Sequence, residues 1–188
     1  MRVLYLSQYF PPEVGATQTR AHEMARGLAA AGHEVTVIGE IPNHPSGIIP
    51  DEYKGKLYEH SQLDGFDVIR VWVYATPNKT FITRLLFYIT YMWSAIFAGL
   101  FLAKGPFDVI YATSPPLFVG GAGFVISLLR RTPFVFEVRD LWPESAIELG
   151  ELNNKWAIKL AEWLESLCYW RAKHIVSVTG GIHDRLSR

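Results

Sequence analysis

The chain has 188 residues, of which 49% are hydrophobic, and its basic and acidic side chains balance at 18 each. This length and composition fit one globular domain with a sizeable core. The balanced charge gives no general basic field, which argues against nucleic acid as a partner. Cys168 is the single cysteine, so no internal disulfide can form, and we expect an ordinary buried thiol.

Short apolar runs alternate with helical patterns along the chain. We expect strands at residues 2–6, 34–38, 66–75, 107–112, 134–138 and 174–178, and helices at 17–31, 80–103, 117–130 and 153–172, with another helix opening at 181–188. Prolines and glycines make 39–62 irregular, although residues 56–60 could pair with the strand that follows. The alternation predicts an α/β fold with a doubly wound, mainly parallel sheet.

The ends of the first helix carry recognisable signals. Thr17 or Thr19 is expected to cap its start, and Gly32 to end it in a left-handed conformation.

Ligands of open parallel sheets bind beyond the carboxyl ends of the strands. Gly15 follows the first strand and precedes a helix, where backbone N–H groups can approach a phosphate; a purely conformational glycine is the alternative. "RDLWPES" follows the strand at 134–138 and supplies Arg139, Asp140 and Glu144. Asp140 could act chemically at the sheet edge, or could cap a short helix. His44 could contact substrate, or could be a mobile surface imidazole.

Several familiar motifs are absent from the sequence. Neither GxGxxG nor GxxxxGK[ST] occurs, which removes the usual dinucleotide and P-loop signatures. No HExxH, paired CxxC or DxD occurs, so we predict no metal site. A nucleotide-sugar epimerase is a weak alternative, because the glycine-rich GxxGxxG turn expected after its first strand is missing.

The ordered set of segments resembles family 4 glycosyltransferases of the GT-B fold. The segments that carry this resemblance are "MRVLYLSQYFPPEVGATQTRAHEMARGLAAAGHEVTVIG", "PNHPSG", "FDVIRVW", "FDVIYATSPP", "FVFEVRDLWPES" and "IVSVTGGI". The likeness covers essentially the whole chain, and "NHPSG" with "RDLWPES" looks most like transferases of bacterial surface polysaccharides such as colanic acid and O-antigen. It implies that residues 1–188 form a Rossmann-like N-terminal, acceptor-side domain. The nucleotide-binding C-terminal domain, with its two spaced glutamates, has no counterpart here, so the isolated domain is expected to be inactive.

The same resemblance implies a retaining transfer of a sugar from a nucleotide donor, a UDP-sugar by our expectation, to a lipid-linked saccharide, without a metal or other cofactor. It assigns Gly15 to the donor phosphates and Asp140 to catalysis or acceptor orientation. Arg139, Thr113, Ser114, Glu144 and His44 are expected to line the cleft. Some relatives have histidine where this chain has Thr113, and many have His-Asp where it has Arg139-Asp140.

The segment at residues 85–103 carries no charge over 19 residues. That length would span about 29 Å as a helix, enough to cross a bilayer. A true span would place the strands at 66–75 and 107–112 on opposite sides of the membrane, so we expect either a buried cover helix or a helix with one face in the membrane surface. Its dense aromatic residues favour membrane contact and a peripheral location on the inner face of the cytoplasmic membrane. A non-catalytic, membrane-associated module that binds lipid-linked glycans is the alternative function.

Overall fold

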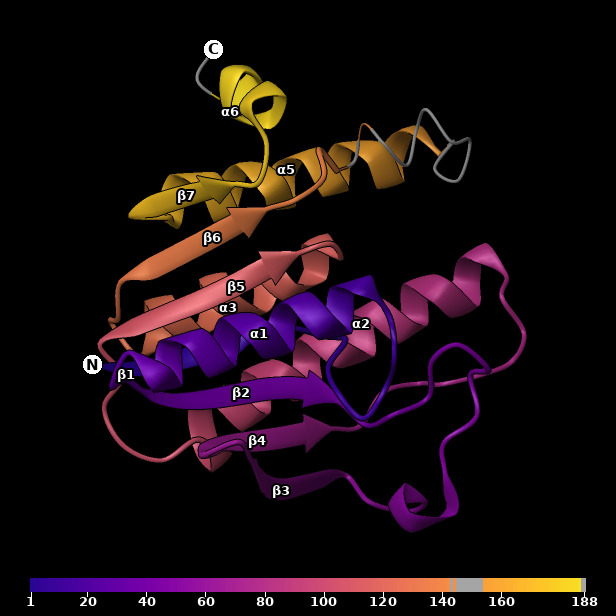
Figure 1. The fold of residues 1–188 in the computed structure, drawn as a ribbon. Helices are drawn as coiled ribbons and strands as arrows, with labels where there is room; N and C mark the ends of the chain where they lie inside the picture. Colours follow the sequence, from indigo (N-terminus) through magenta and orange to yellow (C-terminus); the bar gives the residue numbers. More distant parts are fainter. Residues whose placement is uncertain (143, 145–153, 187–188) are drawn as a thin grey trace.

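The computed structural model describes residues 1–142, 144 and 154–186. Its centre is a seven-stranded sheet with the order β3-β4-β2-β1-β5-β6-β7 (Figure 1). Neighbouring strands are parallel except for the antiparallel pair β3 and β4. The strands are β1 (Arg2–Leu6), β2 (Glu34–Glu40), β3 (Tyr58–Leu63), β4 (Phe66–Val71), β5 (Val109–Ser114), β6 (Phe134–Val138) and β7 (His174–Ser177).

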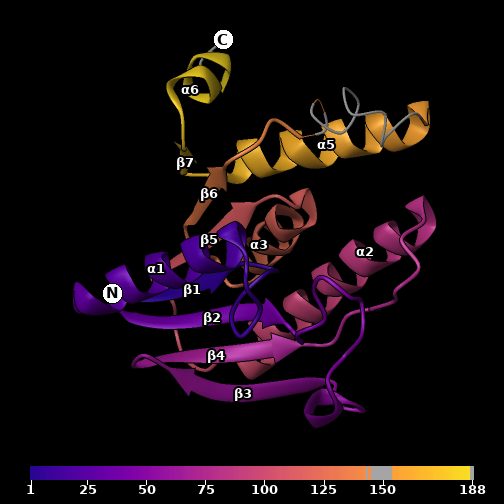
Figure 2. The ribbon, with the colours of Figure 1, turned by 45° about the vertical axis from the view of Figure 1, so that its right-hand side comes forward.

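Helices cover both faces of this sheet, which confirms the predicted Rossmann-like, doubly wound α/β fold. The helices are α1 (Ala16–Ala30), α2 (Phe81–Phe97), α3 (Leu117–Leu129), α5 (Lys155–Arg171) and α6 (Gly180–Leu186), with a 3-10 turn at Asp51–Tyr53 and a π turn at Ala98–Leu102. Figure 2 shows α1 on one side of the sheet and α2, α3 and α5 on the other. Val3, Tyr5 and Val37 are buried beneath α1, whereas Leu4, Leu6 and Ile110 belong to the larger core under the other helices. This division follows from the alternation of side chains along each strand.

The predicted hairpin between residues 56–60 and the next strand exists, with a shifted range. Tyr58 pairs with Val71 and Leu63 pairs with Phe66. Asp64 and Gly65, both with positive φ, make the two-residue turn that favours a tight hairpin. The strand predicted over 66–75 ends at Val71 in the structure.

For helix α1, the structure contradicts the predicted cap at the start and agrees with the predicted end. The predicted cap by Thr17 or Thr19 is wrong, because Gly15 holds the cap position and no side chain bonds to the first turn. The predicted end is confirmed: Gly32 has φ +83°, and its N–H and that of His33 donate to the carbonyls of Ala29 and Leu28.

Helix α2 and the π turn together form one apolar segment, Phe81–Leu102, that by length and composition could cross a membrane. In the structure one side of it packs on the sheet, where Tyr91 is buried and donates its hydroxyl to the carbonyl of Ile38 at 2.9 Å. Trp93, Phe97 and Phe101 are exposed on the other side. The strands before and after this segment, β4 and β5, lie in the same sheet, as the sequence argument required.

Candidate active site

The loops after the parallel strands gather at one edge of the sheet (Figure 1). Strand β1 is central: it pairs with β2 on one side and with β5 on the other. The chain therefore leaves β1 toward one half of the sheet and later builds the other half from β5. In open α/β sheets this reversal of strand order opens the crevice where ligands bind.

The centre of this sheet edge is built by the end of β5 and the residue after β6. Arg139 donates its backbone N–H and its Nε to the carbonyl oxygen of Ser114, at 3.3 and 3.0 Å, and an Nη to the carbonyl of Pro115 at 3.4 Å. Thr113 and Ser114 are buried. The Thr113 hydroxyl has no hydrogen-bond partner, although it is enclosed by protein. Three predicted cleft residues thus lie together, and one of them carries an unsatisfied polar group.

The two predicted acids of "RDLWPES", Asp140 and Glu144, contact different partners. Asp140 is exposed at the sheet edge, and its carbonyl accepts the N–H of Trp142 at 3.0 Å. Whether Asp140 caps a helix falls on residues 143 and 145–153, outside the described part of the chain. Glu144 is exposed and accepts a hydrogen bond from Arg185 of α6 at 2.9 Å.

Gly15 lies at the amino end of α1, on the α1 side of the sheet edge. Its backbone is extended, with φ 166°, so no left-handed conformation demands glycine there. A Cβ at this position would instead lie 2.5 Å from Oε1 of the buried Gln18. The first-turn N–H groups of α1 carry no side-chain cap, which suits an anion at this end of the helix.

A buried polar network that the sequence analysis missed joins the loops after β1 and β2. Glu13 accepts the backbone N–H groups of Asn43 and His44, both at 2.6 Å from its Oε1. Glu40, 2% exposed, accepts the side-chain amides of Gln8 at 2.8 Å and Asn43 at 3.0 Å. Burial, and secondarily the neighbouring Glu13 carboxylate, raise the pKa of Glu40 well above its ordinary value. A glutamate at the end of an apolar strand was the available signal for this network.

His44 owes its position to this network. Its backbone is fixed by Glu13, and its exposed ring lies edge-on to Tyr9, with 5.5 Å between ring centroids.

The sequence analysis also missed an ion pair that lies beneath α1. Arg20 of α1 donates to Glu137 of β6 at 2.5 Å, and the Glu137 side chain is 1% exposed. Burial, and then the charge of Glu137, raise the pKa of the neighbouring phenols Tyr5 and Tyr111. The pair ties α1, which Gly15 opens, to β6, which Arg139 follows, so it fixes the spacing between two candidate site residues.

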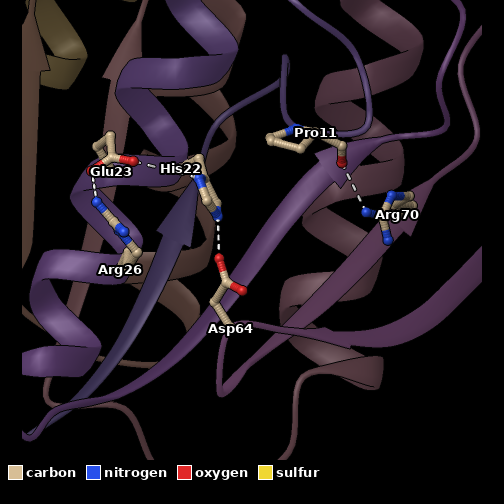
Figure 3. Close-up of polar contacts among 6 residues, drawn as sticks. All are labelled: Pro11, His22, Glu23, Arg26, Asp64 and Arg70. Atoms are coloured by element: carbon tan, nitrogen blue, oxygen red, sulfur yellow. Dashed lines mark hydrogen bonds and ion pairs between the residues drawn. The ribbon is translucent and has the colours of Figure 1, made fainter.

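The β1–α1 loop is also anchored from the hairpin side (Figure 3). Arg70 of β4 donates to the carbonyl of Pro11 at 2.8 Å, and His22 of α1 contacts the carboxylate of Asp64 at 2.7 Å (Figure 3). Glu23 and Arg26 form a further ion pair on α1. These contacts hold the loop that carries Gly15 over the sheet edge.

Fold and edge together define a Rossmann-like α/β domain whose ligands bind at the carboxyl ends of the strands, and the comparisons give its family. The glycosyl transferase 4-like domain family matches residues 15–188, so the chain belongs to this glycosyltransferase family. No group of three or more histidine, cysteine, aspartate or glutamate side chains that could hold a metal ion occurs within residues 1–142, 144 and 154–186.

Two relatives place the chain more closely. It is 25% identical over 150 residues to the putative colanic acid biosynthesis glycosyl transferase WcaI of Escherichia coli K12, an alignment that covers 80% of the chain and 37% of that protein. It also superposes on the sucrose-phosphate synthase of Thermosynechococcus elongatus with a TM-score of 0.58 at 15% identity, over 100% of the chain and 44% of that enzyme. That likeness shows the fold alone. The chain thus spans less than half the length of either relative.

Proposed function

We propose that this chain is the acceptor-side, N-terminal domain of a retaining glycosyltransferase that moves a sugar from a nucleotide sugar to a lipid-linked glycan in bacterial surface polysaccharide synthesis. The observation that carries the proposal is the reversal of strand order between β1 and β5, in a chain of glycosyltransferase family 4. The likeness to a colanic acid transferase supports the substrate class. We expect a UDP-sugar donor, no metal, and a location on the inner face of the cytoplasmic membrane.

The geometry supports separate roles on the two sides of the sheet edge. Gly15, at the uncapped amino end of α1, would approach the donor phosphates. Asp140 is exposed at the edge itself, where a carboxylate can orient or deprotonate an acceptor hydroxyl. Arg139 is held by two carbonyls and would keep the Asp140 loop in place against Ser114 and Pro115.

The exposed apolar side of α2 supports the membrane location. Trp93, Phe97 and Phe101 are all more than half exposed, at 63%, 53% and 71%. Aromatic side chains of this kind are enriched where proteins meet the bilayer interface.

The test is a transfer assay on the full-length protein in membranes, with a panel of UDP- and GDP-sugars and an undecaprenyl-diphosphate-linked acceptor. Asp140→Asn is compared with Asp67→Asn, since Asp67 lies near the start of β4 and so at the opposite edge of the sheet. We expect transfer by the wild type and by the Asp67 variant, and a loss of about a hundredfold or more for the Asp140 variant. Transfer that survives in the Asp140 variant would remove that role. No transfer from any donor would favour a glycan-binding module.

A further inference from the structure

A continuous row of aromatic rings crosses the carboxyl edge of the sheet on the side of α2 and α3. Tyr9 and Phe87 have ring centroids 6.4 Å apart, and Phe87 and Tyr88 are 5.5 Å apart. Tyr88 stacks on Phe118 at 6.0 Å, and Phe118 meets Trp142 edge-on at 6.4 Å. We call these five residues the aromatic row.

The rings of the aromatic row come from separate parts of the chain and converge at the site. Tyr9 follows β1, Phe118 lies in the first turn of α3 after β5, and Trp142 follows β6. All five residues are half-buried, whereas the neighbouring core rings of Phe134 and Phe136 are fully buried. The row therefore leaves aromatic surface open at the edge where ligands of parallel sheets bind.

The row continues into apolar surface at two helix ends. Figure 2 shows the amino-terminal ends of α2 and α5 reaching beyond the ends of the strands. Phe81 and Ile82 at the start of α2 are 47% and 67% exposed, and Trp156 and Leu160 at the start of α5 are 82% and 63% exposed. In α2, Phe81 and Tyr88 share one side of the helix by their spacing of seven residues. These exposed side chains extend apolar surface outward from the row, with Arg84 on the same side of α2 as Phe81 and Tyr88.

A basic side chain stands at each of these two helix ends. Lys79, just before α2, and Lys155, the first residue of α5, are both exposed. This arrangement complements an anionic head group at these helix ends.

We propose that the aromatic row binds the apolar chain of a lipid-linked acceptor that carries an anionic phosphate head. This inference rests on the proposed function and assigns part of its acceptor site. A hydrocarbon chain fits better than a sugar ring, because a sugar site combines rings with several polar partners. Phe87 and Trp142 instead pack against the large apolar core, and the polar network of Glu13 and Glu40 contacts the row only near Tyr9.

The experiment measures the binding of farnesyl diphosphate to the full-length protein by titration calorimetry, with inorganic diphosphate as the chain-free probe. Tyr88→Ala and Phe118→Ala are expected to weaken the binding of farnesyl diphosphate about tenfold each, because each removes a large apolar contact. Tyr88→Phe keeps the ring and should bind like the wild type. Tyr58→Ala, on the outermost strand β3, removes an exposed aromatic ring away from the row; it is the matched control and should also bind normally. Circular dichroism confirms that each variant is folded, and Phe118→Leu, which also removes the ring, replaces Phe118→Ala if the alanine variant does not fold.

Three results would overturn the inference. The first is equal affinity of the row variants and the wild type, or no preference of the wild type for farnesyl diphosphate over inorganic diphosphate. The second is a loss of farnesyl diphosphate binding in Tyr58→Ala as large as in the row variants, which would mean unspecific adsorption on exposed aromatic surface. The third is binding of a lipid-free glycan that is as strong as the binding of farnesyl diphosphate and is lost in the row variants. The proposed function is scored separately: sugar transfer by the wild type to the undecaprenyl-diphosphate-linked acceptor supports it, and the absence of that transfer counts against it while chain binding stands.

Discussion

Adding a single methyl group at Gly120 of α3 is expected to destabilise the fold. A Cβ there would lie 2.6 and 2.7 Å from ring carbons of Phe136 and 3.1 Å from Sγ of Cys168. Alanine gains about 1 kcal/mol of helix propensity over glycine. Overpacking of a rigid core costs about 1–3 kcal/mol, and here a ring from the sheet and a thiol from α5 are met together. Because two rigid neighbours are met, we take the upper part of that range, about 2–3 kcal/mol, and after the helix-propensity gain we expect Gly120→Ala to lower the free energy of unfolding by about 1–2 kcal/mol.

Gly27→Ala is the matched control, because a Cβ at this position in α1 would meet no atom within 4 Å. The same substitution should there raise stability by about 0.5–1 kcal/mol. Urea unfolding followed by circular dichroism compares both variants with the wild type, on condition that their m-values agree. If both variants shift the urea midpoint in the same direction, the close packing of α3 between the sheet and α5 does not determine the effect of the added methyl group, and the reasoning is refuted.

Three further predictions concern buried or site groups. Because the pKa of Glu40 is raised, its contribution to stability is complete below its ordinary pKa of 4.5 and is lost as the pH rises through the folded value. Glu40→Gln should therefore flatten the fall in urea midpoint as the pH rises above 4.5, and an unchanged slope would contradict the buried carboxyl. Burial raises the pKa of Cys168 to about 12, so iodoacetamide should label it only when urea unfolds the protein. Arg139→Lys cannot reproduce the fork onto the carbonyls of Ser114 and Pro115 and should reduce sugar transfer about tenfold without unfolding the protein, whereas undiminished transfer would show that the fork is dispensable.

The parallel strands could be predicted from the sequence because they are buried on both faces and read as apolar runs. The β3 strand is half-exposed, with the sequence "YEHSQL". Because this sequence is mostly polar, its boundaries were harder to predict than those of the apolar strand β4. The π turn at the end of α2 was also missed. Gly99 lies there against Ile126, and that close approach depends on a contact distant in sequence.

The location of the candidate site could be predicted from the sequence, but most of its hydrogen-bond and ion-pair partners could not. Residues after strand ends identify the edge, and Ser114 and Arg139 do meet there. Glu137 was overlooked because it lies within "FVFEV", which was interpreted only as a strand. Glu40 was overlooked because it follows the strand predicted at 34–38, in the stretch 39–62 that was interpreted only as irregular. A buried acid needs a partner, but the identity of that partner, Arg20 or Gln8, depends on the folded chain.

The central place of β1 has a consequence for synthesis on the ribosome. One edge of β1 can pair with β2 soon after both emerge, but the other pairs with β5, so that Val3 meets Val109. At translation rates of about 5–20 residues per second, the second edge of β1 stays open for roughly 5–20 s. An apolar strand with an unpaired edge can recruit another chain during that interval. The strand that lies deepest in the finished sheet is thus the one that nascent-chain chaperones have most reason to shield.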